Sequence, residues 1–176
     1  RNEGVASIVV GTDKKMSEDA ITLAEKNSDI WATIGLHPTD NHAENFDDAI
    51  YEKMAGHPRV VAIGECGLDY YWPSVDQENQ RRALLSAAGA SGQDSLSSPR
   101  KHSSPPPRTA SDSPGLPISL DDEKKRQREL FEHQIAIAKK VGKPLMIHGR
   151  PSKGSMDAYE DILGILKGSG VRGNVH

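Results

Sequence analysis

The sequence has few of the residues that build disulfide scaffolds or membrane spans. It contains one cysteine and two phenylalanines, and aromatic residues make up only 5% of its 176 positions. A single cysteine excludes an internal disulfide and fits a reducing compartment. No apolar run approaches the roughly 20 residues that a membrane-spanning helix needs, so no membrane partner is expected. The chain starts at Arg1, without a methionine or a signal peptide. We therefore expect its natural N-terminus to lie upstream, and a cytoplasmic protein, or a nuclear one in a eukaryotic cell.

Excess positive charge is also absent. The chain has 22 lysines and arginines against 25 aspartates and glutamates, a net charge of -3. This balance excludes a broadly basic protein that coats nucleic-acid phosphates. It does not exclude a nuclease, because metal ions can supply the positive charge that meets a phosphate.

Short apolar strands that alternate with amphipathic helices form the main pattern of the sequence. The expected strands are Val5–Val10, Ile30–Leu36, Val60–Gly64, Leu145–His148 and Val171–His176. One expected helix follows Ser17, its N-cap candidate, and runs to about Lys26, and a second runs from about Asn45 to Gly56. A third runs from about Asp122 to Val141, and a fourth follows Ser155 and stops at Gly168. Such repetition predicts parallel strands joined by right-handed crossovers. Five strands fit either an open doubly wound sheet or part of a (β/α)₈ barrel, since a complete barrel needs about 250 residues.

One segment, residues 83–120, interrupts this pattern. It is rich in serine, proline and glycine, a composition that cannot bury enough apolar surface to offset the entropy of ordering. We predict that it is a disordered insertion. Residues 1–82 and 121–176 are then two parts of the same α/β domain.

Four successive strands are followed by a side chain that can bind a metal or move a proton. His37 follows "WATIGL", Glu65 follows "VVAIG", His148 follows "PLMI", and His176 ends the chain. Each one alone is more typical of a capping or solvated residue. Because all four share one position in the repeat, they are expected at one face of the sheet. Imidazoles and a carboxylate together suit a divalent ion such as Zn²⁺, Mn²⁺ or Mg²⁺.

Residues near these strand ends allow several interpretations. Cys66 follows Glu65 directly and should point to the opposite side, as a small buried apolar residue. Asp69 either caps the following turn or holds a histidine through a hydrogen bond. Arg150 can reach a phosphate oxygen, where its planar guanidinium fits well. The aromatic residues 70–72 either stack on nucleic-acid bases or cover the mouth of the barrel.

The segments "IGLHP", "VVAIGECGLDYY", "FEHQIAIAKKVGKPLMIHGR" and "GNVH" resemble, in order and spacing, the TatD family of metal-dependent hydrolases. That family is a TIM-barrel group related to the amidohydrolases. The resemblance implies an α/β fold, a partial TIM (β/α)₈ barrel with approximately strands two to six and their helices, interrupted by the disordered insertion. Characterised members are largely magnesium-dependent deoxyribonucleases, often with 3′–5′ exonuclease activity.

The resemblance also implies roles for individual residues. Glu65 matches the carboxylate that touches both ions of a two-metal centre, and His148 and His176 match the histidines of the second metal. His37 matches a histidine that lines the site, and Arg150 would face the phosphate. We therefore expect Glu65, His37 and Arg150 to serve catalysis, with two divalent ions per site in the intact protein. Mg²⁺ is the first choice, and Mn²⁺ and Zn²⁺ are alternatives.

Some family features have no counterpart in the sequence. The His-x-His pair of the family's first strand and the aspartate of its last strand are both missing. The implied function is hydrolysis of phosphodiester bonds in a DNA substrate by an intact protein that is monomeric. Two alternatives stay open: an amidohydrolase-like esterase or amidase, and a catalytically incompetent fragment that aggregates or acts at most as a binding module.

Overall fold

The fold was analysed on a computed structural model that describes residues 4–39, 44–75, 78–79, 82 and 119–172. These residues form a four-stranded sheet in the order β1-β2-β3-β4, and each neighbouring pair is parallel. The strands are β1 (Ser7–Val10), β2 (Ile30–Ile34), β3 (Val60–Asp69) and β4 (Leu145–Arg150). Of the expected fifth strand, Val171 and Arg172 form no strand, and residues 173–176 lie outside the described ranges.

Four helices with resolved bounds pack on this sheet. They are α1 (Lys14–Lys26), α2 (Asp48–Ala55), α4 (Leu120–Val141) and α5 (Asp157–Ser169). Residues 71–75 are also helical. In the described ranges, no helix combines the length and the apolar composition that crossing a membrane would require.

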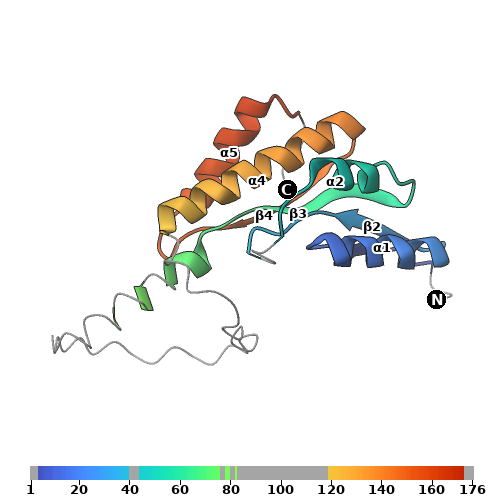
Figure 1. Ribbon diagram of the computed structural model, residues 1–176, viewed down its shortest axis with the longest axis horizontal. Coiled ribbons are helices and arrows are strands. Elements are labelled where there is room, and N and C mark those ends of the chain that lie inside the picture. Colours follow the sequence, from blue (N-terminus) through green and yellow to red (C-terminus); the bar gives the residue numbers. More distant parts are fainter. Residues whose placement is uncertain (1–3, 40–43, 76–77, 80–81, 83–118, 173–176) are drawn as a thin grey trace.

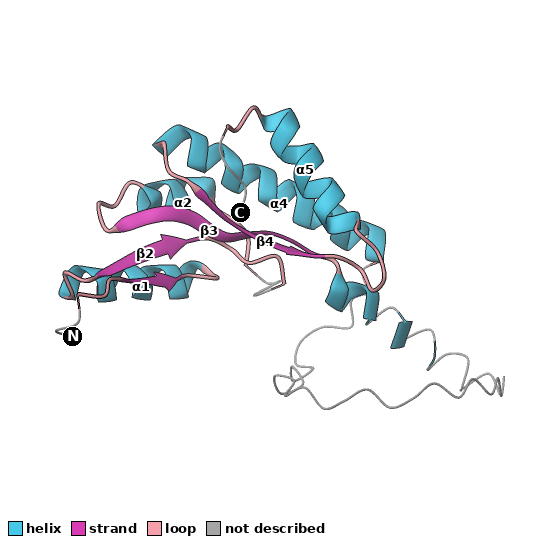
Figure 2. Cartoon of the chain, turned by 180° about the vertical axis from the view of Figure 1, so that it is seen from behind, coloured by secondary structure: helices cyan, strands magenta, loops and turns pink. Residues whose placement is uncertain are grey.

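The order of the strands decides between the two candidate folds. A doubly wound sheet reverses its strand order, whereas here the order in space is the order in the sequence. Side chains of α1, α2 and α4 share one apolar cluster with β2 and β3, so these helices cover the same face. Figures 1 and 2 show α2, α4 and α5 on one side of the curved sheet. The structure therefore confirms a partial α/β barrel.

The N-cap of helix α1 lies four residues earlier than expected. Asp13 is its N-cap, and the Asp13 carboxylate accepts a hydrogen bond from Met16 N at 2.7 Å. Ser17, the expected cap, lies within the helix and is buried. Its hydroxyl accepts a hydrogen bond from Gly35 N at 3.3 Å and so joins α1 to the chain after β2.

The starts of α2 and α4 also differ from the expected positions. Asp47 caps α2, which begins three residues after Asn45, because the Asp47 carboxylate accepts hydrogen bonds from two N–H groups of the first turn. Ser119 caps α4, and Leu120 is its first residue. Residues 119 and 120, the last two of the expected insertion, therefore belong to the start of α4. The other residues of the expected insertion, 83–118, lie outside the described ranges.

Helix α5 follows Ser155, as expected, but ends later than expected. The helix begins at Asp157, and Ser155 lies outside it, where its hydroxyl accepts a hydrogen bond from Asp157 N at 3.0 Å. Gly168 was the expected stop, but it lies inside the helix. The helix ends where Gly170 takes a left-handed conformation with φ of 70°.

Two apolar clusters fill the layer between the sheet and the helices. The first joins β2 and β3 to α1, α2 and α4. The second joins the end of β3 to α4 and α5, and its buried members are Cys66, Leu68, Tyr70, Phe131, Ile135, Ala158, Ile162 and Leu166. Burying a large apolar side chain completely contributes about 1.5–3 kcal/mol, so these clusters hold the helices on the sheet.

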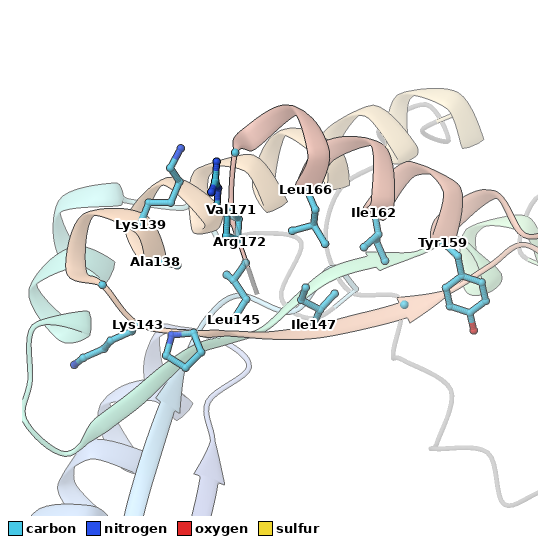
Figure 3. A pocket seen from close by; sticks show the side chains of 14 residues that line it. Ala138, Lys139, Lys143, Leu145, Ile147, Tyr159, Ile162, Leu166, Val171 and Arg172 are labelled. Atoms are coloured by element: carbon cyan, nitrogen blue, oxygen red, sulfur yellow. The ribbon is translucent and has the colours of Figure 1, made fainter. Parts of the chain in front are cut away.

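A hollow of about 860 Å³ opens between β4 and α5 (Figure 3). Leu145 and Ile147 of β4 line it together with Ile162 and Leu166 of α5. Because side chains alternate along a strand, His148 points to the other face of the sheet. The hollow therefore lies on the helix side of β4, and the polar strand-end residues belong to the opposite, open face.

Candidate metal centre

An extra residue in β3 sets the direction of Glu65. The strand was expected to end at Gly64, but it continues to Asp69. Ile63 and Cys66, three residues apart, lie opposite β4 residues that are only two apart, so β3 contains a bulge between them. In a regular strand Glu65 would share the helix-facing side of Ile63. With the bulge, Cys66 takes that side and is fully buried, which confirms the expected opposite orientation of the two neighbours.

The two glycines that flank Glu65 and Cys66 allow β3 and β4 to approach closely. Gly64 has φ of 143° and Gly67 has φ of 132°, a region that side chains rarely adopt. A Cβ atom on Gly64 would collide with the carbonyl oxygen of Met146, and one on Gly67 with that of His148. The spacing "GECG" therefore brings the backbone that carries Glu65 against the strand that carries His148.

His37, Glu65 and His148 converge on the open face. One ligand atom from each lies within 4.8 Å of the other two. His148 Nδ1 lies 2.9 Å from Glu65 Oε1, and the rings of His37 and His148 meet edge to face with centroids 4.5 Å apart. His37 follows β2, whereas Glu65 and His148 lie within β3 and β4. The structure therefore brings together three of the four residues that were expected at strand ends. The fourth, His176, lies outside the described residues.

Asp69 fulfils both of the roles considered for it. Its Oδ2 lies 3.1 Å from His148 Nε2, and its Oδ1 accepts a hydrogen bond from Tyr71 N at 3.1 Å. A neutral His148 that donates its Nε2 proton to Asp69 presents the lone pair of Nδ1 on the side of Glu65. A histidine fixed in this way by a carboxylate is typical of metal ligands.

The two carboxylates also shift the proton affinity of His148. Burial by itself lowers the pKa of the ring, but the hydrogen bonds to Asp69 and Glu65 outweigh burial and raise the pKa of His148 above its ordinary value. The site therefore has a negative potential that favours a cation.

The Glu65 carboxylate and the His148 imidazole fit a divalent ion, and the His37 ring lies beside them. Imidazole nitrogen suits Zn²⁺ and other transition metals, and carboxylate oxygen suits Mg²⁺ and Mn²⁺. The donor set in the described residues is compatible with the expected metal centre and does not select one ion.

Arg150 and its aromatic neighbours lie beside this cluster at the end of β4. The Arg150 guanidinium carbon is 4.5 Å from the centre of the Tyr71 ring and 5.3 Å from that of Trp72. Tyr70 is fully buried, and its hydroxyl donates a hydrogen bond to Asp161 at 2.8 Å. Stacking of Tyr70 on a base is therefore excluded in this conformation. The half-exposed Trp72 and Tyr71 form one surface with Arg150, whose phosphate-facing role stays a prediction.

Two residues near the site were not identified from the sequence. Gln127 and Gln134 of α4 are fully buried, and their amides bind backbone groups of Asp69 and Leu36. They lie seven positions apart on the helix face that is otherwise mostly apolar. Two amides on an otherwise apolar helix face are the sequence pattern from which these residues could have been identified.

Comparison with known proteins places the chain in a family. Residues 1–92 and 114–176 match the sequence profile described as "TatD related DNase". The chain belongs to this family. Its TatD relatives include a protein of Bacillus subtilis named "Uncharacterized metal-dependent hydrolase YabD", 31% identical over 165 residues, which are 93% of this chain and 44% of the relative.

A second TatD relative carries a more specific name. The "3'-5' ssDNA/RNA exonuclease TatD" of Escherichia coli is 40% identical over 80 residues, 44% of this chain and 30% of the relative. The crystal structure of YjjV, a TatD homologue of Escherichia coli, has a TM-score of 0.51 at 20% identity and covers 95% of this chain and 49% of that chain. This likeness supports the barrel fold. The chain spans about half the length, or less, of the relatives that it matches.

Proposed function

We propose that this chain carries part of the active site of a metal-dependent nuclease that hydrolyses phosphodiester bonds in DNA, in the manner of a 3′–5′ exonuclease, through a two-metal centre. The observation that carries the proposal is the convergence of His37, Glu65 and His148 from the segment after β2 and from the adjacent strands β3 and β4. The names of the TatD relatives support the choice of nucleic acid as substrate.

Each residue of the cluster has a distinct part in this proposal. Glu65 has two carboxylate oxygens and can contact two ions, while His148 offers Nδ1 and His176 completes the second site. Bound divalent ions in such a centre activate water as a nucleophile and neutralise charge on the phosphate. Asp69 keeps His148 in the tautomer that leaves Nδ1 available.

His37 has the geometry of a hydrogen-bond donor to the substrate. Its Nδ1 accepts a hydrogen bond from Thr39 N at 3.3 Å, so a neutral His37 carries its proton on Nε2. We propose that this N–H binds a phosphate oxygen and stabilises the charge that grows there during attack.

Arg150 is proposed to bind a neighbouring phosphate. Its guanidinium already stacks on Tyr71 and Trp72, which restricts its rotamers before substrate arrives. Trp72 is 40% exposed and offers a face to a terminal base, a contact worth about 1–3 kcal/mol in single-strand binding.

The test compares the full-length protein with its Glu65→Gln variant, which keeps the shape of the side chain and removes its charge. Calorimetric titration with Mn²⁺ and degradation of 5′-labelled single-stranded DNA are measured on both. We expect Glu65→Gln to lose metal affinity by more than about 100-fold, beyond the loss that outer-shell partners cause, and to lose DNA degradation.

The control is Glu129→Gln, which changes an exposed acid on α4 that pairs with Lys125. It should behave as the wild type in both measurements. Unchanged affinity and unchanged DNA degradation in Glu65→Gln would overturn the proposal. Turnover of small esters or amides without degradation of DNA would favour the amidohydrolase-like alternative, because the same ions polarise a carbonyl.

A further inference from the structure

We infer that Gln127 and Gln134 are positioning residues, through which α4 fixes the backbone next to the metal centre at two strand ends. This inference rests on the proposed function, since it concerns the geometry of that same centre.

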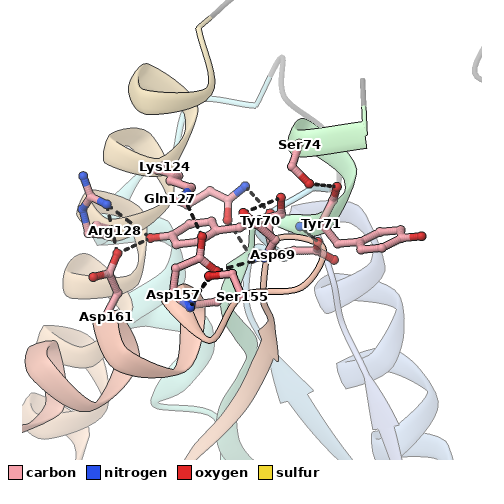
Figure 4. A network of polar contacts seen from close by, with 12 residues as sticks. Asp69, Tyr70, Tyr71, Ser74, Lys124, Gln127, Arg128, Ser155, Asp157 and Asp161 are labelled. Atoms are coloured by element: carbon pink, nitrogen blue, oxygen red, sulfur yellow. Dashed lines mark hydrogen bonds and ion pairs between the residues drawn. The ribbon is translucent and has the colours of Figure 1, made fainter. Parts of the chain in front are cut away.

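Gln127 binds both the backbone N–H and the backbone carbonyl of Asp69. Asp69 N donates to Gln127 Oε1 at 2.8 Å, and Gln127 Nε2 donates to Asp69 O at 2.9 Å. Figure 4 shows Gln127 reaching from α4 to Asp69. The Asp69 carboxylate then lies 3.1 Å from His148 Nε2, so the position of the amide determines where that carboxylate meets the histidine.

Gln134 makes the same pair of bonds to the residue before His37. Leu36 N donates to Gln134 Oε1 at 3.0 Å, and Gln134 Nε2 donates to Leu36 O at 3.0 Å. On the other side of His37, Arg126 Nη2 donates to Pro38 O at 2.6 Å. Helix α4 therefore holds the backbone immediately before and immediately after His37.

The spacing on α4 explains how one helix reaches both strand ends. Gln127 and Gln134 are seven residues apart, close to two turns, and so lie on one face of the helix. Leu36 lies beyond the last residue of β2, where the pairing with neighbouring strands ends. A side-chain amide has both a donor and an acceptor and can satisfy both backbone groups of such a residue, whereas an apolar side chain of the same size can satisfy neither.

General packing alone does not explain the choice of these two contacts. One amide binds Asp69 itself, and the other binds the neighbour of His37, although α4 packs along much of the sheet. Both contacts therefore act on residues that carry or adjoin the candidate ligands.

The experiment uses Gln127→Met and Gln134→Met in the full-length protein, which keep the length of the side chain and remove its hydrogen bonds to the backbone of Asp69 or Leu36. Gln127→Met also removes the hydrogen bond from Gln127 Nε2 to Glu123 Oε1 at 2.9 Å. Mn²⁺ affinity is measured by calorimetry, and the electron paramagnetic resonance signal of bound Mn²⁺ reports its ligand symmetry. We expect Gln127→Met to lower Mn²⁺ affinity by about 10-fold to 100-fold, the range of outer-shell partners. Gln134→Met should lower kcat on single-stranded DNA more than it changes KM. Excess Mn²⁺ should restore most of the activity of Gln127→Met but not that of Gln134→Met.

The matched control is Ile137→Ala, which weakens the packing of α4 at a buried residue of the first apolar cluster. It should lower the melting temperature and leave Mn²⁺ affinity and the resonance signal unchanged. If Gln127→Met does not fold, Gln127→Asn keeps a neutral amide and shortens its reach to Asp69, and the same loss of affinity is expected.

The outcomes separate the inference from the proposed function. Wild-type Mn²⁺ affinity and an unchanged resonance signal in the folded Gln127 variants would overturn the positioning role and leave the proposed function standing. An equal loss of affinity in Ile137→Ala would also overturn it, because the effect would then come from general packing. Failure of the wild-type protein to bind Mn²⁺ would overturn the proposed function and the inference together.

Discussion

Replacing Asp69 with asparagine should weaken metal binding without weakening the fold. Asp69 Oδ1 accepts from Tyr71 N and Oδ2 lies 3.1 Å from His148 Nε2. Asparagine keeps an oxygen for the first contact and turns an amide N–H₂ toward the second. His148 must then carry its lone pair on Nε2 and its proton on Nδ1, the nitrogen that lies 2.9 Å from Glu65 and is the proposed ligand.

The expected size of the effect follows from this change of tautomer. Loss of an outer-shell carboxylate lowers metal affinity by about 10-fold to 100-fold, which is roughly 1.4–2.8 kcal/mol of binding free energy. The side chain of Asp69 is only 2% exposed. Asparagine keeps both hydrogen bonds of this buried side chain, so the free energy of unfolding without metal should stay close to that of the wild type at a pH where His148 is neutral.

The assay is calorimetric titration of Mn²⁺ into the full-length protein and its Asp69→Asn variant, with thermal denaturation of both in a chelator. Asp48→Asn is the matched control, because Asp48 also contacts a histidine, with its Oδ1 3.0 Å from His133 Nδ1, but on the exposed surface. An affinity of Asp69→Asn that equals the wild type, or an equal loss in Asp48→Asn, would refute the reasoning.

Two further predictions concern the fold. Phe131 is fully buried in the second apolar cluster, so Phe131→Ala should lower the free energy of unfolding by about 3–5 kcal/mol, as measured by urea denaturation; a loss below about 1 kcal/mol would contradict the packing described. Burial alone would raise the pKa of Asp157, but hydrogen bonds from Lys124 and from two backbone N–H groups lower that pKa well below its usual value. This carboxylate therefore stabilises the fold at pH values above about 3.9, the ordinary carboxyl pKa, and its contribution is lost as the pH falls through the lowered value. Asp157→Asn should melt at a lower temperature than the wild type at pH 7, and the difference should shrink below pH 4; a difference that is constant with pH would contradict the assignment.

The parts of the fold that depend on local sequence were predictable. Helix α4 is predicted by apolar residues at helical spacing and by the glycine that follows them. In the structure this glycine, Gly142, ends the helix with φ of 68°. The approach of His37, Glu65 and His148 was predictable because a parallel repeat brings residues at equivalent positions to one edge of the sheet, although the side that Glu65 faces depends on the bulge in β3. The N-cap of α1, Asp13, was not predicted, because aspartate and serine are both good caps and only the burial of Ser17 decides between them.

The remaining features depend on contacts between distant parts of the chain. The bulge in β3 is defined by its register with β4, about 80 positions later, and no local pattern fixes that register. In the sequence Tyr70 resembles its two aromatic neighbours after the strand. In the structure the bulge directs its side chain into the apolar layer. In the sequence Gln127 and Gln134 are polar interruptions of an apolar helix face. Their role depends on the strand ends that they bind, which only the structure shows.

The bulge in β3 also makes the site sensitive to chain length. Removing one residue at Gly64–Glu65 would leave a single residue between Ile63 and Cys66, which is regular pairing with β4, and the residues after Cys66 would keep their faces. The bulge therefore lets β3 carry a glycine and an acid where a regular strand has room for one residue. A deletion would remove either the glycine that admits the Met146 carbonyl or the carboxylate of the site. We therefore expect natural variants of this segment to exchange residues while keeping their number constant.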